Sequence, residues 1–317
     1  MGESRSGRPR VVALGGGHGL AVTLRALVAL HADVTAIIGT GDDGGSSGRL
    51  RADLGVPPPG DLRMALVALS GDGSGQSLWS RVMQHRFGGS GDLEGHALGN
   101  LLLAALWEET GDVVAGIDAL GRALEVQGRV LPNCVEAVDV VAQIASAGDG
   151  DVTVIEGQAR VTATRGRVSS ISLIPPDPRA CPQAVEAIQA ADAIVFGPGS
   201  WFTSVLPHLL VPGIAEAIDE SSAPRILILN AAEQPGETSG FESDSYLESW
   251  RALFPTRRID VVLADPAVAG DRGLLVERAT AIGATVHLAT VLSAEQGIHD
   301  PRLLAAALEA VLPHPSP

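Results

Sequence analysis

The sequence has 317 residues, of which 37 are acidic and 22 basic, giving a net charge of −15. This balance argues against a nucleic-acid partner, because binding to a phosphate backbone requires clustered Lys and Arg. No apolar segment approaches the ~20 residues needed to cross a bilayer. Residues 1–10 form a short basic N-terminus with no apolar signal core behind it. We therefore expect a cytoplasmic protein without a membrane span.

Short apolar runs alternate along the chain with helical segments. This alternation predicts an α/β fold with a Rossmann-like, mostly parallel sheet and helices on both faces. The predicted strands cover residues 10–14, 34–39, 193–196, 225–230, 260–263 and 285–289. The predicted helices cover residues 20–30, 60–69, 78–86, 98–110, 113–125, 182–190, 205–210, 243–253, 272–282 and 301–311.

Two regions interrupt the alternation. Residues 75–147 contain several helical segments in a row and no candidate strand, which predicts a helical insertion. Residues 152–174 carry three short β-patterned runs, which predict a small antiparallel meander. The three runs are 152–155, 159–164 and 168–173.

These features predict one domain rather than two. We expect a single Rossmann-like domain over residues 11–312 that contains both insertions. We expect residues 1–10 to be a flexible N-terminus and residues 313–317 a short tail.

A strand, a glycine loop and a helix start follow one another over residues 11–20. The loop can direct free N–H groups and the positive end of the helix dipole at a phosphate. Leu20 stands where the dinucleotide fingerprint has its last glycine, so that motif is not matched. His18 can either donate to a phosphate or cap the helix. The candidate binding residues are Gly15, Gly16, Gly17, His18 and Gly19.

The run 40–51 is rich in Gly, Ser, Asp and Arg and has no apolar face to bury. We interpret it as a loop in which Ser46, Ser47 and Arg49 contact phosphate. Asp42 and Asp43 are candidates for holding Mg²⁺, which prefers oxygen ligands. The alternative is an ordinary Gly-Ser loop with solvated charges.

Two later helix starts also carry polar residues. Asp61 follows three prolines, and a capping role is sufficient for it, since negative charge is favoured in the first helical turn. Arg63 is not explained by capping, so we predict that it reaches the ligand. Asn100 ends a Gly-His-x-x-Gly-Asn entrance to an apolar helix, and we predict that it binds the ligand too, although a purely structural role for His96 and Asn100 remains open.

Two more loops complete the predicted site. The segment after the strand 193–196 again has a strand, glycine loop and helix start, with Trp201 and Phe202 able to stack on a base or simply to pack. Because the carboxyl ends of parallel strands share one sheet edge, we expect these loops to converge with the earlier ones. The candidates are Gly197, Gly199, Ser200, Thr203, Asn230 and Thr238.

These motifs together resemble the gluconeogenesis factor family (YvcK type), which is related to the phospholactate transferases (CofD type) of deazaflavin cofactor synthesis. The resemblance runs from Val11 to about Leu304. It rests on the motifs at 15–20, 42–50, 58–63, 95–101, 197–200 and 234–238. It implies a Rossmann-like fold and a cytoplasmic protein needed for cell shape and wall synthesis during gluconeogenic growth. It also implies binding of a UDP-sugar such as UDP-N-acetylglucosamine. His18 and Trp201 depart from the residues usual in the family.

Two functions from different classes follow. The first is a non-catalytic nucleotide-sugar binder that requires no cofactor and acts on proteins of cell-wall synthesis. The second is a transferase that moves a phospho-acyl group from a nucleotide diphosphate to an alcohol, with Asp42 and Asp43 as catalytic Mg²⁺ ligands. The sequence offers no assignable general base, which favours binding without chemistry. We also expect a homo-oligomer, a dimer.

Overall fold

The computed structural model describes residues 7–70, 77–145, 152–164, 167–234, 236–293 and 298–313. The predicted flexible N-terminus and the C-terminal tail lie largely outside these described residues. The elements that position the candidate site lie inside them.

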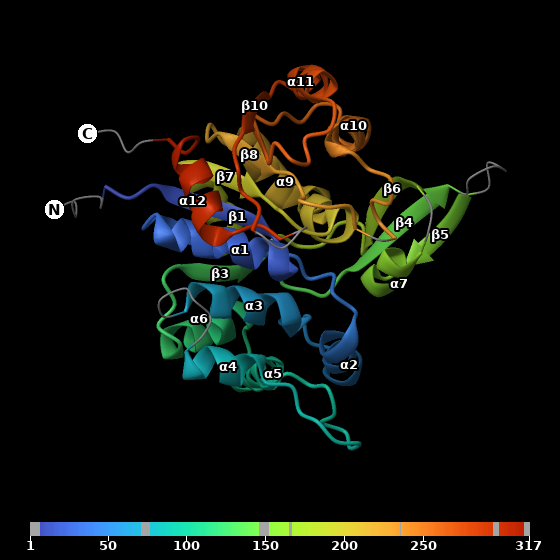
Figure 1. The fold of residues 1–317 in the computed structure, drawn as a ribbon. Coiled ribbons are helices and arrows are strands. Elements are labelled where there is room, and N and C mark those ends of the chain that lie inside the picture. Colours follow the sequence, from blue (N-terminus) through green and yellow to red (C-terminus); the bar gives the residue numbers. More distant parts are fainter. Residues whose placement is uncertain are drawn as a thin grey trace.

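A seven-stranded sheet, parallel at each pairing, forms the centre of the molecule (Figure 1). Its order is β10-β9-β8-β7-β1-β2-β3. All six predicted strands are confirmed. The strands are β1 (Arg10–Gly15), β2 (Asp33–Ile38), β3 (Arg129–Pro132), β7 (Ala193–Phe196), β8 (Arg225–Ile228), β9 (Val261–Ala264) and β10 (Thr285–Leu288).

Apolar side chains cover both faces of this sheet. In β1, Val11 and Ala13 face one core, and Val12 and Leu14 face the other. Such two-sided burial is why the strands read as continuous apolar runs. The first core packs against α1 (Gly17–Ala29), α3 (Pro59–Leu69), α4 (Leu78–Gln84), α5 (Leu98–Thr110), α6 (Val113–Ala123) and α12 (Pro301–Glu309). The second packs against α8 (Pro182–Ala190), α9 (Pro212–Glu220), α10 (Ser243–Leu253) and α11 (Arg272–Ala281).

The predicted helical insertion is wrong in one respect, because residues 75–147 also contain strands. β3 pairs in parallel with β2 at the edge of the main sheet. β3 has only four residues and ends in a proline, a position that an edge strand tolerates. Its own pattern is therefore too short to show a strand, and pairing with β2 decides its conformation.

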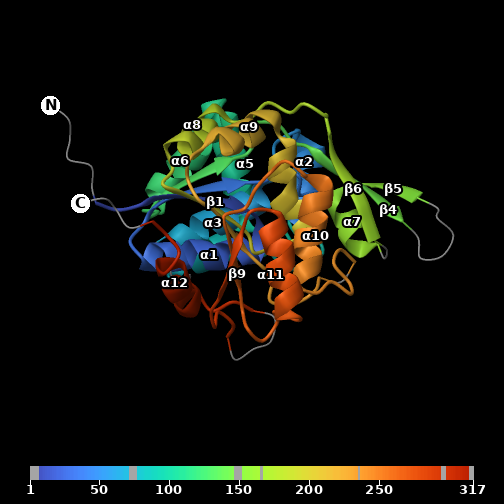
Figure 2. The same cartoon turned by 90° about the horizontal axis from the view of Figure 1, so that it is seen from above.

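The small antiparallel sheet is confirmed, but its composition differs from the prediction. It consists of β4 (Asp139–Ala145), β5 (Val152–Glu156) and β6 (Arg167–Ile174), in the order β5-β4-β6. The predicted middle strand, 159–164, is instead the short helix α7 (Gln158–Ala163), beside this sheet at one end of the molecule (Figure 2). A six-residue run does not distinguish strand from helix, and a cap from a distant residue favours the helix here.

The run 40–51 is also helical over most of its length, which differs from the predicted loop. α2 (Gly45–Leu54) ends at Gly55, whose φ of 68° suits a glycine at a helix terminus. After β7 the chain forms a π-helical turn, η1 (Trp201–Val205), and a 3-10 turn, η2 (Leu206–Leu210).

The order of the strands indicates where along the sheet a ligand is expected to bind. All strands run in the same direction, but the strand order proceeds from β1 through β2 to β3 on one side of the sheet and from β7 through β8 and β9 to β10 on the other. The reversal falls between β1 and β7, and open α/β sheets bind ligands in the crevice outside the carboxyl ends of such strands.

Candidate functional site

The crevice at this reversal is formed by two glycine loops that touch. Gly19, in the first turn of α1, lies so close to the Pro198 carbonyl oxygen that a Cβ on residue 19 would overlap it. Gly197 has a φ of 69°, and its carbonyl oxygen accepts a hydrogen bond of 3.0 Å from Thr23 Oγ1. The sequence-predicted loops after β1 and β7 are therefore brought together.

Asn230 holds the second loop in place. Its Nδ2 donates to Gly199 O and its Oδ1 accepts from Gly199 N, both at 2.9 Å. Gln234 Oε1 accepts from Trp201 N at 3.2 Å, and Gln234 Nε2 donates to Ser200 Oγ at 3.4 Å. Asn230 thus shapes the loop from the end of β8.

A cleft of about 230 Å³ opens where these loops meet. Residues from α1, from both loops and from the segment before α12 line it. They are His18, Gly19, Val22, Pro198, Gly199, Asn230, Ala231, Ala232, Glu233, Gln234, Ile298 and His299. The structure therefore places His18, Gly19, Gly199 and Asn230, all predicted to bind the ligand, around one cavity.

Asp61 lies at the N-terminus of α1. A Cβ on Gly16 would overlap Asp61 Oδ2, and the Gly17 N–H favours the charged form of this carboxylate. Burial, and next the nearby Asp42 carboxylate, raise the pKa of Asp61 to about 7. Asp61 therefore occupies the end of α1 where an external anion is expected to bind, and sequence reasoning accounted for it only as a cap.

Asp42 and Asp43 point to different elements. Asp42 Oδ1 accepts from Gly44 N at 3.0 Å, and its charge acts on Asp61. Asp43 Oδ1 accepts from Ala159 N at 2.8 Å, in the first turn of α7. The two aspartates thus serve different elements, and the Asp42 carboxylate is near enough to Asp61 to raise its pKa. Among the described residues, no group of three or more His, Cys, Asp and Glu side chains has an arrangement that could hold a metal ion.

The two serines of the run hold its helix against α3 and α5. Ser47 Oγ accepts from Gly60 N at 3.0 Å. Ser46 Oγ lies 3.0 Å from His96 Nδ1 and accepts from Asn100 Nδ2 at 2.9 Å. Both serines and Asn100 are buried, and these three residues, which the sequence predicts to contact the ligand, form hydrogen bonds within the protein instead.

The two predicted arginines differ in their environment. Arg49 Nη2 donates to Glu94 O at 2.6 Å on the surface. Arg63 is only 3% exposed, and its Nε and Nη1 have no hydrogen-bond partner. Burial, and next the Arg86 charge, lower the pKa of Arg63 to about 10, while Asp61 and Asp42 oppose that shift.

Other predicted contacts lie inside the protein. Thr203 Oγ1 donates to Glu237 Oε1 at 2.5 Å, and Phe202 N donates to Glu237 Oε2 at 3.0 Å. Thr238 is fully buried, and its Oγ1 accepts from Gln234 N at 2.7 Å. Trp201 and Phe202 are buried in the core, so they pack rather than line a cleft.

Sequence reasoning missed His208 and Glu237. His208 is completely buried below the first loop, and Nε2 lies 3.3 Å from Gly15 O. Burial lowers the pKa of His208 to about 4, so the ring is neutral at pH 7. His208 stands in an apolar run that gives no signal for a role, whereas Glu237 lies in the 234–238 motif, in which only Thr238 is a candidate.

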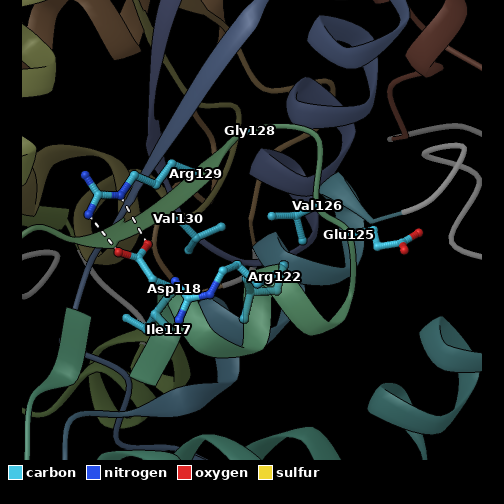
Figure 3. A pocket seen from close by; sticks show the side chains of 10 residues that line it. Ile117, Asp118, Arg122, Glu125, Val126, Gly128, Arg129 and Val130 are labelled. Atoms are coloured by element: carbon cyan, nitrogen blue, oxygen red, sulfur yellow. Dashed lines mark hydrogen bonds and ion pairs between the residues drawn. The ribbon is translucent and has the colours of Figure 1, made fainter. Parts of the chain in front are cut away.

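A separate pocket of about 190 Å³ lies between α6 and the start of β3 (Figure 3). Its Arg129 and Asp118 form an ion pair of 2.8 Å. Because it opens at the amino ends of the strands, it is not part of the candidate site. Arg122 on its rim is exposed.

No single helix within the described ranges is long and apolar enough to cross a membrane, although Trp201–Leu210 and Pro212–Glu220, bent by 78°, would be if taken together.

Comparison with known proteins confirms the resemblance drawn from the motifs. The profile of the family described as 2-phospho-L-lactate transferase CofD matches residues 11–290. The gluconeogenesis factor of Bacillus subtilis is 38% identical over 258 residues, covering 81% of this chain and 79% of that protein. A Mycobacterium tuberculosis protein that is also named as a gluconeogenesis factor is 48% identical over 306 residues, covering 95% of this chain and 90% of that protein. A crystal structure of a UPF0052 family member from Bacillus halodurans has a TM-score of 0.85 at 35% identity, covering 97% of this chain and all of that one.

Proposed function

This chain belongs to the CofD family. We propose that it is a gluconeogenesis factor and that it binds a nucleotide sugar at the crevice between β1 and β7. The likeness to proteins named gluconeogenesis factor covers most of the chain. The ligand we propose is a UDP-sugar of the UDP-N-acetylglucosamine class.

The observation that carries this proposal is the meeting of the two glycine loops beside the 230 Å³ cleft. A diphosphate laid across the N-terminus of α1 would accept from the Gly17 N–H in place of Asp61. Asn230, Gln234 and His18 then face the remainder of the ligand from the cleft.

The cellular role that we propose is control of cell shape and wall synthesis during gluconeogenic growth. In that role the protein is cytoplasmic, forms a homodimer, and acts on proteins of cell-wall synthesis after the nucleotide sugar binds. It performs no reaction and requires no cofactor.

Calorimetric titration of UDP-N-acetylglucosamine into the purified protein tests this proposal. We expect saturable binding that weakens at least about tenfold in Asn230→Ala, because that change removes both hydrogen bonds to Gly199. Arg122→Ala, at the separate pocket, should bind like the wild type. No binding by the wild type, or an equal loss in both variants, would refute the proposed site.

The Asp42–Asp61 pair favours a second candidate function, a phospho-acyl transferase. Two neighbouring carboxylates suit Mg²⁺, which is commonly held by one or two carboxylates with water and substrate phosphates. Bound there, the ion would neutralise charge on the transferred phosphoryl group. If Asp42 and the substrate phosphates held the ion, Asp61 would stay free of the metal and could accept the proton of an attacking alcohol as the alcohol oxygen bonds to phosphorus and the nucleotide monophosphate leaves.

Mass spectrometry separates the two functions. Incubation with a lactyl-phospho-guanosine donor, a deazaflavin acceptor and Mg²⁺ should leave both molecules unchanged if the protein only binds. Steady formation of the phospholactyl product, lost in Asp61→Asn, would establish the transferase instead.

A further inference from the structure

Arg63 carries a buried positive charge with no hydrogen-bond acceptor in the part of the chain that the structure describes. Its side chain is 3% exposed, and both Nε and Nη1 are fully buried without a partner. Asp61 and Asp42 are near enough to act on its charge, but neither forms an ion pair with it. Buried charges in native proteins are normally paired, so an unpaired guanidinium indicates a missing anion.

The side chain of Arg63 lies against the first turn of α5. A Cβ on Gly99, in the first turn of this helix, would lie 2.8 Å from Arg63 Cδ and 2.9 Å from Cγ, so the arginine crosses that turn directly. The N-cap residue Ala97 provides no side-chain cap, so no side chain of the N-cap offsets the positive end of this 13-residue helix, although Leu98 N already donates to His85 O at 2.9 Å.

Two further arginines frame the same segment. Arg86 Nη1 donates to Gly95 O at 2.8 Å, and Arg49 Nη2 donates to Glu94 O at 2.6 Å. Three arginines thus surround one helix start in a chain whose net charge is −15. Their mutual repulsion is unfavourable in the free protein and would be relieved by an anion.

We propose that Arg63 and the N-terminus of α5 form a second anion subsite, which takes a carboxylate on the sugar side of the bound nucleotide. This inference rests on the proposed function: the Asp61 carboxylate, which touches the N-terminus of α1 where the diphosphate would lie, is near enough to act on the Arg63 charge. The planar guanidinium suits a carboxylate, which it can bind through two parallel hydrogen bonds. The ligand is then an acidic nucleotide sugar.

A matched pair of ligands tests the subsite. UDP-N-acetylmuramic acid differs from UDP-N-acetylglucosamine by one lactyl ether, which adds a carboxylate. We expect the wild type to bind the acid at least about tenfold more tightly. In Arg63→Met the ratio of the two Kd values should approach one. Arg63→Lys should retain part of the preference for the acidic sugar, and Arg122→Met should retain the full preference of the wild type. Equal binding by the wild type, or a ratio that survives in Arg63→Met, would overturn the proposal.

A second measurement separates this role from a structural one. If Arg63 merely balances Asp61 and Asp42, Arg63→Met should lower the Tm of the ligand-free protein. We expect an unchanged or higher Tm, because a buried unpaired charge is removed. If neither UDP-sugar binds, the proposed function is refuted. Inorganic phosphate then serves as the probe that tests whether the anion subsite exists. Phosphate should raise the Tm of the wild type but not of Arg63→Met, and an equal response of both proteins would overturn the subsite.

Discussion

At the scale of single residues, two adjacent aspartates contribute to different parts of the molecule. Asp43 caps α7, which lies beside the small antiparallel sheet, whereas the charge of Asp42 acts on Asp61 near the glycine loop. Adjacent residues diverge because the chain turns directly after β2, and each carboxylate then meets a different element.

Alanine at each position should therefore have a different effect. Asp43→Ala should lower the free energy of unfolding by about 1 kcal/mol, since it removes a helix cap, while the Kd for UDP-N-acetylglucosamine hardly changes. Asp42→Ala should leave stability nearly unchanged and abolish any effect of Mg²⁺ on binding. Urea unfolding and calorimetry measure the two effects, and identical profiles for the two variants would contradict this division.

The raised pKa of Asp61 predicts a pH dependence of stability. The folded protein keeps a proton on Asp61 up to about pH 7, whereas the unfolded chain releases it near the usual value of 3.8. Stability should consequently fall as pH rises through this range, because the folded state binds more protons. In Asp61→Asn this fall should be reduced, by on the order of 1 kcal/mol per pH unit at most. Urea unfolding of both proteins at several pH values tests it, and parallel curves would be the contrary result.

At the scale of elements, the contact of α1 with the loop after β7 fixes the crevice. Gly19 faces the Pro198 carbonyl, whereas nothing lies within 4 Å of a Cβ placed on Gly17. Gly17 has a φ of 63°, so its requirement for glycine is conformational rather than steric.

Alanine substitutions should distinguish these two glycines. Gly19→Ala should destabilise the protein by about 1–3 kcal/mol or more, because α1 must move away from the loop. Gly17→Ala should cost about 1 kcal/mol, the penalty of a left-handed backbone for an L side chain. Thermal unfolding gives both values. A larger loss in Gly17→Ala than in Gly19→Ala would show that the contact is not the constraint.

At the scale of the whole molecule, the proposed ligand lies between two halves of one sheet. One half comprises β1 to β3 and the other β7 to β10. A ligand held by the loops after β1 and β7 links segments that are about 180 residues apart in sequence.

Hydrogen exchange should register this link. UDP-N-acetylglucosamine is expected to slow amide exchange in residues 15–20 and 197–204 together. Residues 117–130, around the pocket of Figure 3, should be unaffected and serve as the internal control. Protection confined to one of the two loops would place the ligand elsewhere.

The homodimer stays a prediction that sedimentation analysis would test.

The sequence by itself determined the main sheet and the loops at its edge. Six strands were predictable because buried parallel strands are continuous apolar runs with glycine or polar residues at their carboxyl ends. The same reasoning identified Gly19, Gly197 and Asn230, whose loops the structure brings together.

Tertiary structure decided what local pattern could not. β3 is a strand because β2 offers it a partner, and α7 is a helix that Asp43 caps from 116 positions away. The pairing of Asp42 with Asp61, and the unpartnered burial of Arg63, likewise depend on elements that meet only in the folded protein. Charge and burial are properties of surroundings in space, so a pattern read along the chain cannot assign them.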